Sequence, residues 1–459
     1  MTKTIKLALV AAMAMGATSA FATNGDNLIG LGAKSRAMGG TGVAHYNGAE
    51  SATSNPALIT KGKGVQFTFG GTYFRPDVEV KTSNTLVGSP VPGDNDLSAE
   101  SDAKHNVIPF VALTHDLENG FVVGASMFGS AGMGTDWRST APLGNADFSP
   151  AAVPAPGSEG DFGLYSMRSN LLLLKFSVPI AYGQDNWSVG IAPVLMYGSL
   201  DISFQTPDQG FPFGGGPGTG PVAPIGGVNN QGHGSSSSFG IGLELGAAYT
   251  LPDMGLTIGA TYHSPIEMEY KDQISSAGAA FGFGGATAGF SDKLEQPGEY
   301  GLGIDWTEGD ISLTADWKNI RWGSARGYED FGWENQSVYA LGGEYRMDDL
   351  TLRAGFNYAS NPIKNNQDST SVTGQPLALG GNSIGDTKNA FNAVMFPAIT
   401  QRHYTLGAGY QFTKNVGVDA AFTYGVSGDQ SYDAASVGLG KIEVSNDQIA
   451  LSAGLNYTF

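Results

Sequence analysis

The stretch Gln448–Phe459, with the sequence QIALSAGLNYTF, decides the fold of this chain. Every second residue from Ile449 to Phe459 is apolar, while the residues between them are small and mostly polar. Successive side chains of a β-strand point to opposite faces, so the stretch predicts a strand with one apolar and one polar face. A strand of about ten such residues is typical of one span of a transmembrane β-barrel. Strands of soluble sandwiches alternate too, usually over about five or six residues, so length and repetition must decide.

The same alternation recurs from Gly64 to Phe459 in about fourteen segments, the number expected of a medium-sized barrel. The segments are Val65–Val80, Asn106–His115, Phe121–Gly134, Tyr165–Tyr182, Trp187–Ser203, Phe239–Thr250, Leu256–Tyr270, Gln296–Trp306, Ile311–Ile320, Val338–Tyr345, Leu350–Ala359, His403–Phe412, Val416–Val426 and Gln448–Phe459. The sequence therefore predicts an all-β fold, a transmembrane antiparallel β-barrel of about 14 strands over residues 64–459.

The connections between these segments alternate in length. Short turns fall at 116–120, 183–186, 251–255, 307–310, 346–349 and 413–415, and the other connections are roughly 15 to 40 residues long. Outer-membrane barrels have short turns on the periplasmic rim and long loops outside. A propeller or a sandwich gives no reason for such a strict alternation. We therefore expect a multi-pass protein of the bacterial outer membrane.

Composition narrows the class of protein further. Only 14 % of the 459 residues are charged, which is little for an ordinary soluble protein. No apolar run of about 18 residues follows the extreme N-terminus, which argues against transmembrane helices. The net charge of -18 argues against nucleic acid as a partner. Cysteine is absent, so disulfides and thiolate metal sites are excluded.

The first 22 residues have the three parts of an export signal. Lys3 and Lys6 precede the apolar run Leu7–Ala14, and small residues lead to Ala20-Phe21-Ala22. A short buried helix is the alternative, but the order of charge, apolar run and small residues favours a signal peptide over residues 1–22.

Residues 23–63 do not alternate. The segment is rich in small residues and is interrupted at Gly39–Gly42 and at Asn55-Pro56. A segment of this composition before the first strand fits a plug, or hatch, inside the barrel. A disordered periplasmic leader is the alternative, although apolar residues such as Leu28 and Ile59 exceed what disorder usually tolerates.

The inward faces of the strands, opposite the apolar face expected to contact lipid, differ in composition around the barrel. The segments between Phe121 and Ser203 place apolar residues there, namely Val122, Phe128, Leu171, Leu173, Val194 and Met196. Later segments place charged residues there, namely Glu244, Asp305, Asp316, Lys318, Glu344, Arg353 and Asp419. A water-filled porin does not need an apolar wall, whereas a conduit for amphipathic molecules does. These apolar side chains either bind a ligand or pack against the plug, and both can hold together.

Two long glycine-rich loops carry aromatic residues. Gln205–Ser238 contains Phe211 and Phe213, and Lys271–Lys293 contains Phe281 and Phe283. Such aromatics either pack on one another or form an apolar landing site. The longest connection, Asn361–Arg402, is expected to fold partly inward.

Several stretches also carry a family resemblance. They are Gly30–Gly42 followed by Ser54-Asn55-Pro56-Ala57-Leu58, Arg75-Pro76-Asp77-Val78, the run from Phe128 to Thr135, and Phe396-Pro397-Ala398-Ile399 before His403-Tyr404-Thr405-Leu406-Gly407. In these the chain resembles the FadL/TodX (OmpP1) family of outer-membrane transporters for long-chain fatty acids and hydrocarbons. The resemblance covers essentially the whole mature chain.

The resemblance implies uptake of a hydrophobic ligand, from an outer-loop groove to a lumen pocket and out sideways through a kinked third strand. No energy source is evident in the sequence, so we expect the uptake to be passive. By position, the hatch motif is Asn55-Pro56-Ala57, and the kink is Gly129, Ser130, Ala131 and Gly132. The groove maps to Phe211, Phe213, Phe281 and Phe283. The implied partners are a long-chain fatty acid or hydrocarbon, outer-membrane lipid and lipopolysaccharide, and the outer-membrane assembly machinery that recognises the C-terminal strand.

Two rival functions fit the sequence less well. An outer-membrane hydrolase embedded in the barrel would need a histidine site, but the six histidines have no metal-binding spacing and no catalytic motif surrounds them. We therefore expect no catalytic residue, no metal ligand and no cofactor. A general diffusion porin would have polar inward faces all round and no plug, which the apolar wall contradicts.

Overall fold

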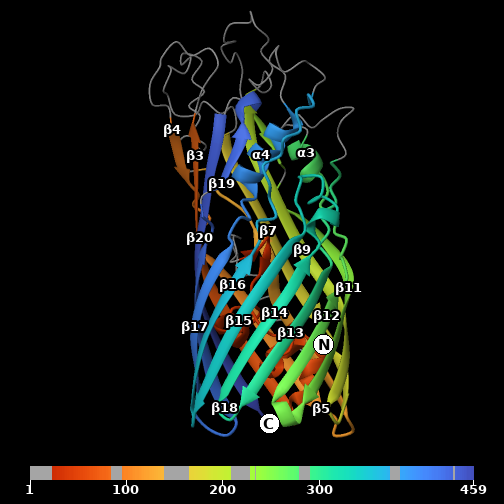
Figure 1. The fold of residues 1–459 in the computed structure, drawn as a ribbon. Helices are drawn as coiled ribbons and strands as arrows, with labels where there is room; N and C mark the ends of the chain where they lie inside the picture. The colour runs from red at the N-terminus through yellow and green to blue at the C-terminus, as the bar shows by residue number, and fades with distance from the viewer. Residues whose placement is uncertain are drawn as a thin grey trace, which may run out of the picture.

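The computed structural model describes residues 23–83, 96–138, 165–207, 228–232, 234–278, 290–372, 383–428, 430–437 and 440–459. Within these residues, consecutive antiparallel strands close into a barrel, because the last strand, β20 (Gly440–Thr458), pairs with the first, β3 (Val65–Ser83) (Figure 1). The predicted 14-stranded barrel is confirmed.

The wall consists of β3 and twelve strands before β20, with the broken pair β7 and β8 counted as one. They are β5 (Asn106–Asp116), β6 (Phe121–Met133), β7 (Tyr165–Ser177) with β8 (Ile180–Gln184), β9 (Trp187–Pro207), β11 (Ser236–Leu251), β12 (Leu256–His263), β13 (Glu299–Glu308), β14 (Ile311–Ile320), β15 (Gln336–Met347), β16 (Leu350–Ala359), β17 (Arg402–Gln411) and β18 (Val416–Val426).

The alternation predicted for the last strand holds in the structure. Leu451 and Leu455 are 52 % and 43 % exposed on the outer surface, whereas Ala450 and Ser452 are 1 % and 4 % exposed. The outward apolar row suits contact with lipid, while the small inward row leaves room in the lumen. None of the helices among the described residues is long and apolar enough to cross a membrane.

Two predicted segments were wrong in running through a proline at which the strand is interrupted or ends. The segment predicted as Tyr165–Tyr182 is divided into β7 and β8 at residues 178–179, where Pro179 has no N–H to donate to the ladder. The segment predicted to run from Leu256 to Tyr270 ends as a strand at His263, two residues before Pro265. The following residues form only isolated bridges with 293–296.

Short strands extend the wall at the long-loop end, and the sequence did not predict them. β4 (Asp96–Glu100) pairs with the end of β3, β10 (Val228–Gln231) with the end of β9, and β19 (Gln430–Ala434) with the start of β20. Figure 1 shows β4 and β19 at this end of the molecule.

The N-terminal segment lies within the lower half of the barrel, where it is red to orange in Figure 1. It consists of β1 (Thr23–Asn24), β2 (Asn27–Leu28), α2 (Ala33–Ala37) and the 3-10 helices η1 (Gly48–Thr53) and η2 (Pro56–Lys61). Inward side chains of the wall bind its backbone: Asp316 accepts from the amides of Gly42 and Val43 at 2.8 and 2.9 Å. These bonds hold the N-terminal segment against the inner face of the wall.

Loop segments fold inward at the opposite end. They include α3 (Ile274–Gly278), η5 (Trp322–Ser324) and α4 (Ile384–Met395). The single turn η7 (Ala435–Val437) follows β19, whereas the single turn η3 (Pro252–Met254) belongs to the short connection between β11 and β12. Ser383 is the N-cap of helix α4, since its hydroxyl accepts from the Asp386 amide at 3.0 Å. Its Phe391 side chain is fully buried, which agrees with the expected inward fold of this connection.

Candidate functional site

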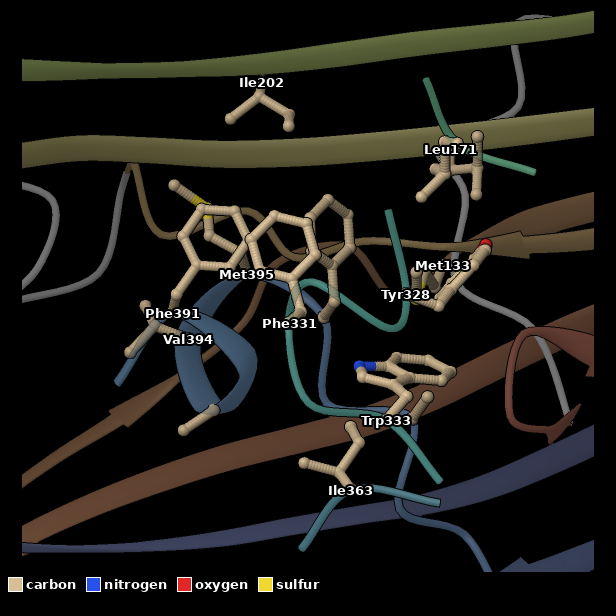
Figure 2. Close-up of a cluster of buried hydrophobic side chains, with 14 of the residues drawn as sticks. Met133, Leu171, Ile202, Tyr328, Phe331, Trp333, Ile363, Phe391, Val394 and Met395 are labelled. Carbon is tan, nitrogen blue, oxygen red and sulfur yellow. The ribbon is translucent and has the colours of Figure 1, made fainter. Parts of the chain in front are cut away.

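An apolar cluster fills the upper lumen, and Figure 2 shows it in close-up. Phe391, Val394 and Met395 come from α4, and Tyr328, Phe331 and Trp333 come from the connection between β14 and β15; they pack against wall residues that include Met133, Leu171 and Ile202. The rings are in close contact: Phe331 and Phe391 stack with centroids 4.6 Å apart. We call this set the aromatic cluster.

The aromatic cluster is densely packed. A gap of about 10 Å³ remains, lined by Tyr328, Phe331 and Trp333 and by apolar residues of the wall and loops. Binding sites for drug-sized ligands are about 300–1,000 Å³. A hydrocarbon chain can therefore enter only if side chains of the cluster move.

A second cavity lies between the N-terminal segment and the wall. Its volume is about 90 Å³, and its lining combines apolar Val194 and Met196 with charged Lys175, Glu244 and Lys318. Lys175 and Glu244 form an ion pair of 2.8 Å. An ammonium group next to apolar side chains is a chemistry that suits an amphipathic ligand, although this volume is smaller than a long acyl chain requires.

The six apolar residues predicted to line the lumen lie at different heights. Val122 packs with Ala52 and Ile59 of the N-terminal segment, and Phe128 packs with its Ala33. The other four join the aromatic cluster, namely Leu171, Leu173, Val194 and Met196. Packing against the N-terminal segment thus accounts for Val122 and Phe128, while Val194 and Met196 face a cavity.

The charged inward residues hold the N-terminal segment. Lys34 lies 3.7 Å from Asp419, which also binds Arg353 at 2.6 Å. Burial raises the pKa of the Glu50 carboxyl in η1 to about 7, although the Lys34 charge opposes this rise. The same side of the wall that the sequence indicated as charged therefore anchors the segment.

The Asn55-Pro56-Ala57 motif docks on the wall. The Asn55 side chain caps η2, since its Oδ1 accepts from the Ala57 amide at 3.0 Å, and its Nδ2 donates to the Val43 carbonyl at 2.7 Å. Opposite it, Gly246 of β11 leaves so little room that a Cβ there would lie 2.0 Å from Asn55 Oδ1. The motif therefore fits because this wall position has no side chain.

Replacing Gly246 tests this close fit. Gly246→Ala should lower the free energy of unfolding by about 1–3 kcal/mol, because the added methyl group displaces the Asn55 cap. Urea denaturation of the purified protein measures the change. Gly343→Ala is the control, since a Cβ at Gly343 meets no atom closer than 3.5 Å. Equal stability of the two variants would contradict the docking of the motif at this position.

The predicted kink lies where two strands of the wall separate. The ladder between β5 and β6 ends at the pair Phe110 and Phe128, and the pairing of β6 with β7 shifts register between Gly129 and Ala131. Beyond this point β6 pairs instead with the N-terminal segment: Ala131 lies opposite Asn27. Among the described residues, the upper part of β5 therefore pairs with β3 alone.

The predicted outer-loop residues Phe211, Phe213, Phe281 and Phe283 lie outside the described residues, as do residues 1–22. Of the neighbouring aromatics that are described, Phe290 packs against Phe331 at 4.8 Å between ring centroids. Within the described part of the chain, no group of three His, Asp or Glu side chains is placed to hold a metal ion.

Comparison with known proteins places the chain among outer-membrane transport proteins. The family model described as outer membrane protein transport protein (OMPP1/FadL/TodX) matches residues 7–149 and 159–375. A long-chain fatty acid transport protein of Escherichia coli O6:H1 is 25 % identical over 416 residues, 81 % of this chain and 84 % of that protein. Outer membrane protein P1 of Haemophilus influenzae is 24 % identical over 86 % of this chain and 83 % of its own length.

Solved structures support the fold. The toluene transporter TodX of Pseudomonas putida superposes with a TM-score of 0.62 at 20 % identity, covering 94 % of this chain and 99 % of that one. A FadL homologue of Pseudomonas aeruginosa superposes with a TM-score of 0.64 at 18 % identity, covering 95 % of this chain and 100 % of that one. Because the family model matches most of the chain, the protein belongs to the OMPP1/FadL/TodX family of outer membrane transport proteins.

Proposed function

We propose that this protein carries long-chain fatty acids or other hydrophobic compounds passively across the outer membrane and releases them sideways between β5 and β6. The observation that carries the proposal is the end of the β5–β6 ladder at Phe128, next to the aromatic cluster in the lumen. The names of the relatives support the ligand class, since one is a long-chain fatty acid transport protein and another a toluene transporter.

The proposed route begins at the long loops, which include the segments with Phe211, Phe213, Phe281 and Phe283. The ligand then enters the aromatic cluster and the cavity beside Val194 and Met196. Burial of an acyl chain contributes about 0.8 kcal/mol per CH₂, enough to draw the chain out of water without an energy source. Transport then follows the concentration gradient.

The exit is proposed at the kink. Gly129, Ser130, Ala131 and Gly132 follow the last β5–β6 pair, and here the N-terminal hairpin β1–β2 closes the gap by pairing with β6. Release needs this hairpin to leave, because Asn27 otherwise lies opposite Ala131. We accordingly propose that residues 1–22 are a signal peptide, 23–63 a plug and 64–459 the barrel. In this proposal the assembly machinery recognises the last strand of the barrel, and the outer face of the barrel contacts lipid and lipopolysaccharide.

Filling the kink tests the route. A Cβ at Gly129 would lie 2.5 Å from the Ile108 side chain of β5, so Gly129→Phe should obstruct the gap and lower oleate uptake roughly tenfold or more. The measurement is accumulation of radiolabelled oleate, and in parallel toluene, by Gram-negative cells that lack their own fatty acid transporter.

The control is Gly343→Phe, which places the same ring on the lipid-facing side of β15 and should leave uptake unchanged. The electrophoretic mobility of each variant, compared between unheated and heated samples, shows whether its barrel has folded. Normal uptake by a folded Gly129→Phe variant would remove the lateral exit. A high ionic conductance of the unmodified protein without any oleate or toluene uptake would instead favour a diffusion porin.

A further inference from the structure

The cavity of about 90 Å³ between the N-terminal segment and the wall has balanced charges. Two cations line it, Lys175 of β7 and Lys318 of β14. Two carboxylates line it as well, Glu244 of β11 and Glu299 of β13, and the remaining titratable residue of the lining is His263 of β12. With a neutral imidazole, the formal charge of the lining is zero. A ligand carboxylate therefore adds a net negative charge to a small enclosed site, where an unbalanced charge is costly.

Both cations of the cavity already have partners. Lys175 Nζ donates to Glu244 Oε1 at 2.8 Å and lies 5.7 Å from the centroid of the Phe128 ring, within reach of a cation–π interaction. Lys318 interacts electrostatically with Asp316, two residues before it on the same strand. A ligand carboxylate that binds Lys175 has to displace Glu244, which is then a buried charge without a partner. The cavity therefore disfavours the head group of a fatty acid.

The same lining contains buried polar atoms that lack a partner. Among the described residues, Glu244 Oε2, His263 Nε2 and Ser130 Oγ have no hydrogen-bond partner. Glu244 and His263 are directly opposite each other in the β11–β12 ladder, and the Glu244 residue is only 2 % exposed. An ionised carboxylate can only accept hydrogen bonds, so Glu244 Oε2 needs a donor. A second carboxylate cannot supply one, whereas a hydroxyl group both donates and accepts.

The chain of such a ligand has an apolar surface beside the cavity. Val194, Met196 and Ile266 line the cavity and also pack in the aromatic cluster. A ligand whose head group lies beside Glu244 can therefore extend its chain towards this cluster as the cluster side chains move. The polar and apolar parts of an amphipathic molecule each have a matching surface here.

We propose that this cavity selects hydrophobic ligands that carry a hydroxyl head group, such as long-chain alcohols, over carboxylates with the same chain. The selectivity rests on the proposed function, because it names the ligand class that the lumen favours. The hydroxyl donates to Glu244 Oε2 and leaves the ion pair with Lys175 intact. Oleate remains a ligand, since its chain makes the same apolar contacts, but a weaker one. Glu244 is the residue that determines this specificity.

Three ligands with the same hydrocarbon chain test the proposal. Oleyl alcohol has an uncharged head group that donates, its methyl ether has an uncharged head group that only accepts, and oleate is charged and only accepts. The measurement is equilibrium binding of each radiolabelled compound to the purified protein in detergent. A pH of about 9 keeps the oleate carboxylate ionised in the micelle. The dissociation constant of oleyl alcohol should be about tenfold lower than those of its methyl ether and of oleate.

Variants of the ion pair assign the selectivity to Glu244. Glu244→Gln leaves Lys175 without a counter-charge, which a ligand carboxylate then supplies, so oleate should bind about tenfold more tightly than it does to the unmodified protein. Combining Lys175→Met with Glu244→Met removes the acceptor and should make oleyl alcohol and its methyl ether bind equally. Apolar replacement of both members of a buried ion pair is usually tolerated.

Glu344→Gln is the matched control. Glu344 is also an inward carboxylate of the wall, paired with Arg353 at 2.7 Å, but it lies outside the lining of this cavity. The ratios of the three dissociation constants should therefore stay unchanged in this variant. The electrophoretic mobility of unheated and heated samples again shows that each variant has folded.

Equal affinities of the unmodified protein for oleyl alcohol and its methyl ether, or tighter binding of oleate than of the alcohol, would overturn the selectivity. An unchanged ratio of alcohol to oleate affinity in a folded Glu244→Gln variant would do so too. Failure of the selectivity is distinguishable from failure of the proposed function. If the three ligands bind alike while Gly129→Phe blocks oleate uptake, only the selectivity is wrong. If oleyl alcohol binds selectively while a folded Gly129→Phe variant takes up ligands normally, the selectivity stands and the lateral exit is wrong.

Discussion

A disulfide between cysteines introduced as Asn27→Cys and Ala131→Cys should abolish uptake of oleate, and reduction should restore it. The two residues are partners in the short antiparallel pairing of β2 with β6. Directly opposite residues of such a pair have Cα atoms about 4.5–5.5 Å apart, within the range that a disulfide needs. The bond would hold the hairpin on β6 however the aromatic cluster is occupied. Uptake before and after oxidation, and again after dithiothreitol, measures the effect.

Because the chain has no natural cysteine, the introduced pair is the only disulfide that can form within it. Each single cysteine variant should transport normally under oxidising conditions. A second pair, Ala315→Cys with Leu341→Cys, links β14 to β15 in a part of the wall that the proposal treats as fixed. Its oxidation should leave uptake unchanged. Full uptake through an oxidised 27–131 pair would mean that the hairpin need not move, and the lateral route would fall with it.

The strands were predictable because their signal is local. Each side chain of a strand reports its own face, so the row of Leu451 and Leu455 could be assigned to lipid before any partner strand was known. The breaks at Pro179 and Pro265 were missed even though proline is a visible signal. In both cases apolar residues continue past the proline, and this continuity outweighed the lost hydrogen-bond donor.

The contents of the lumen were less predictable, because periodicity gives the face of a residue but not its height or partner. Val122 and Leu171 carry the same inward signal, yet one packs against η2 and the other against the aromatic cluster. Asp316 was assigned correctly to the inner face, but its role in binding the Gly42 and Val43 amides joins residues far apart in sequence.

The aromatic cluster was only partly foreseen. The connection Asn361–Arg402, which contains Phe391, Val394 and Met395, was expected to fold partly inward. Its helix α4 was not predicted, although Ser383 and Asp386 form a recognisable N-terminal cap. Trp322, Tyr328 and Trp333 were not singled out at all. Three large aromatics within one loop are a usable signal, since such residues usually need a partner surface.

Raising the pH from about 5 to about 8 should favour undocking of the hairpin, by at most roughly 100-fold. Burial raises the pKa of the docked Asp26 carboxyl to about 7, whereas the ordinary value of 3.8 applies once the hairpin is in water. Between these two values the docked form binds the proton and the undocked form does not. The docked form is therefore stabilised at low pH, and this stabilisation is lost as the pH rises towards 7.

Among the described residues, the titratable groups that face Asp26 do not reverse this direction. Tyr328 and Tyr270 face Asp26, and burial raises the pKa of both phenols, so they stay neutral over the whole range. Glu50 has a pKa of about 7 for the same reason, but it lies in η1, beyond the hairpin. The Asp26→Asn variant distinguishes the effect of Asp26 from that of Glu50, because it removes the titrating group of the hairpin and leaves Glu50 intact.

The measurement is the rate at which a hydrophilic maleimide labels the buried thiol of an Asn24→Cys protein, divided at each pH by the rate of a Lys414→Cys protein. Lys414 lies on an exposed turn, so the ratio cancels the ionisation of the thiol itself. The ratio should rise with pH in the natural background and become nearly flat with Asp26→Asn. An equally steep rise with Asp26→Asn would assign the pH dependence to another group, with Glu50 the first to test by Glu50→Gln. In that case, loss of the proton from the Asp26 carboxyl would not contribute to undocking of the hairpin.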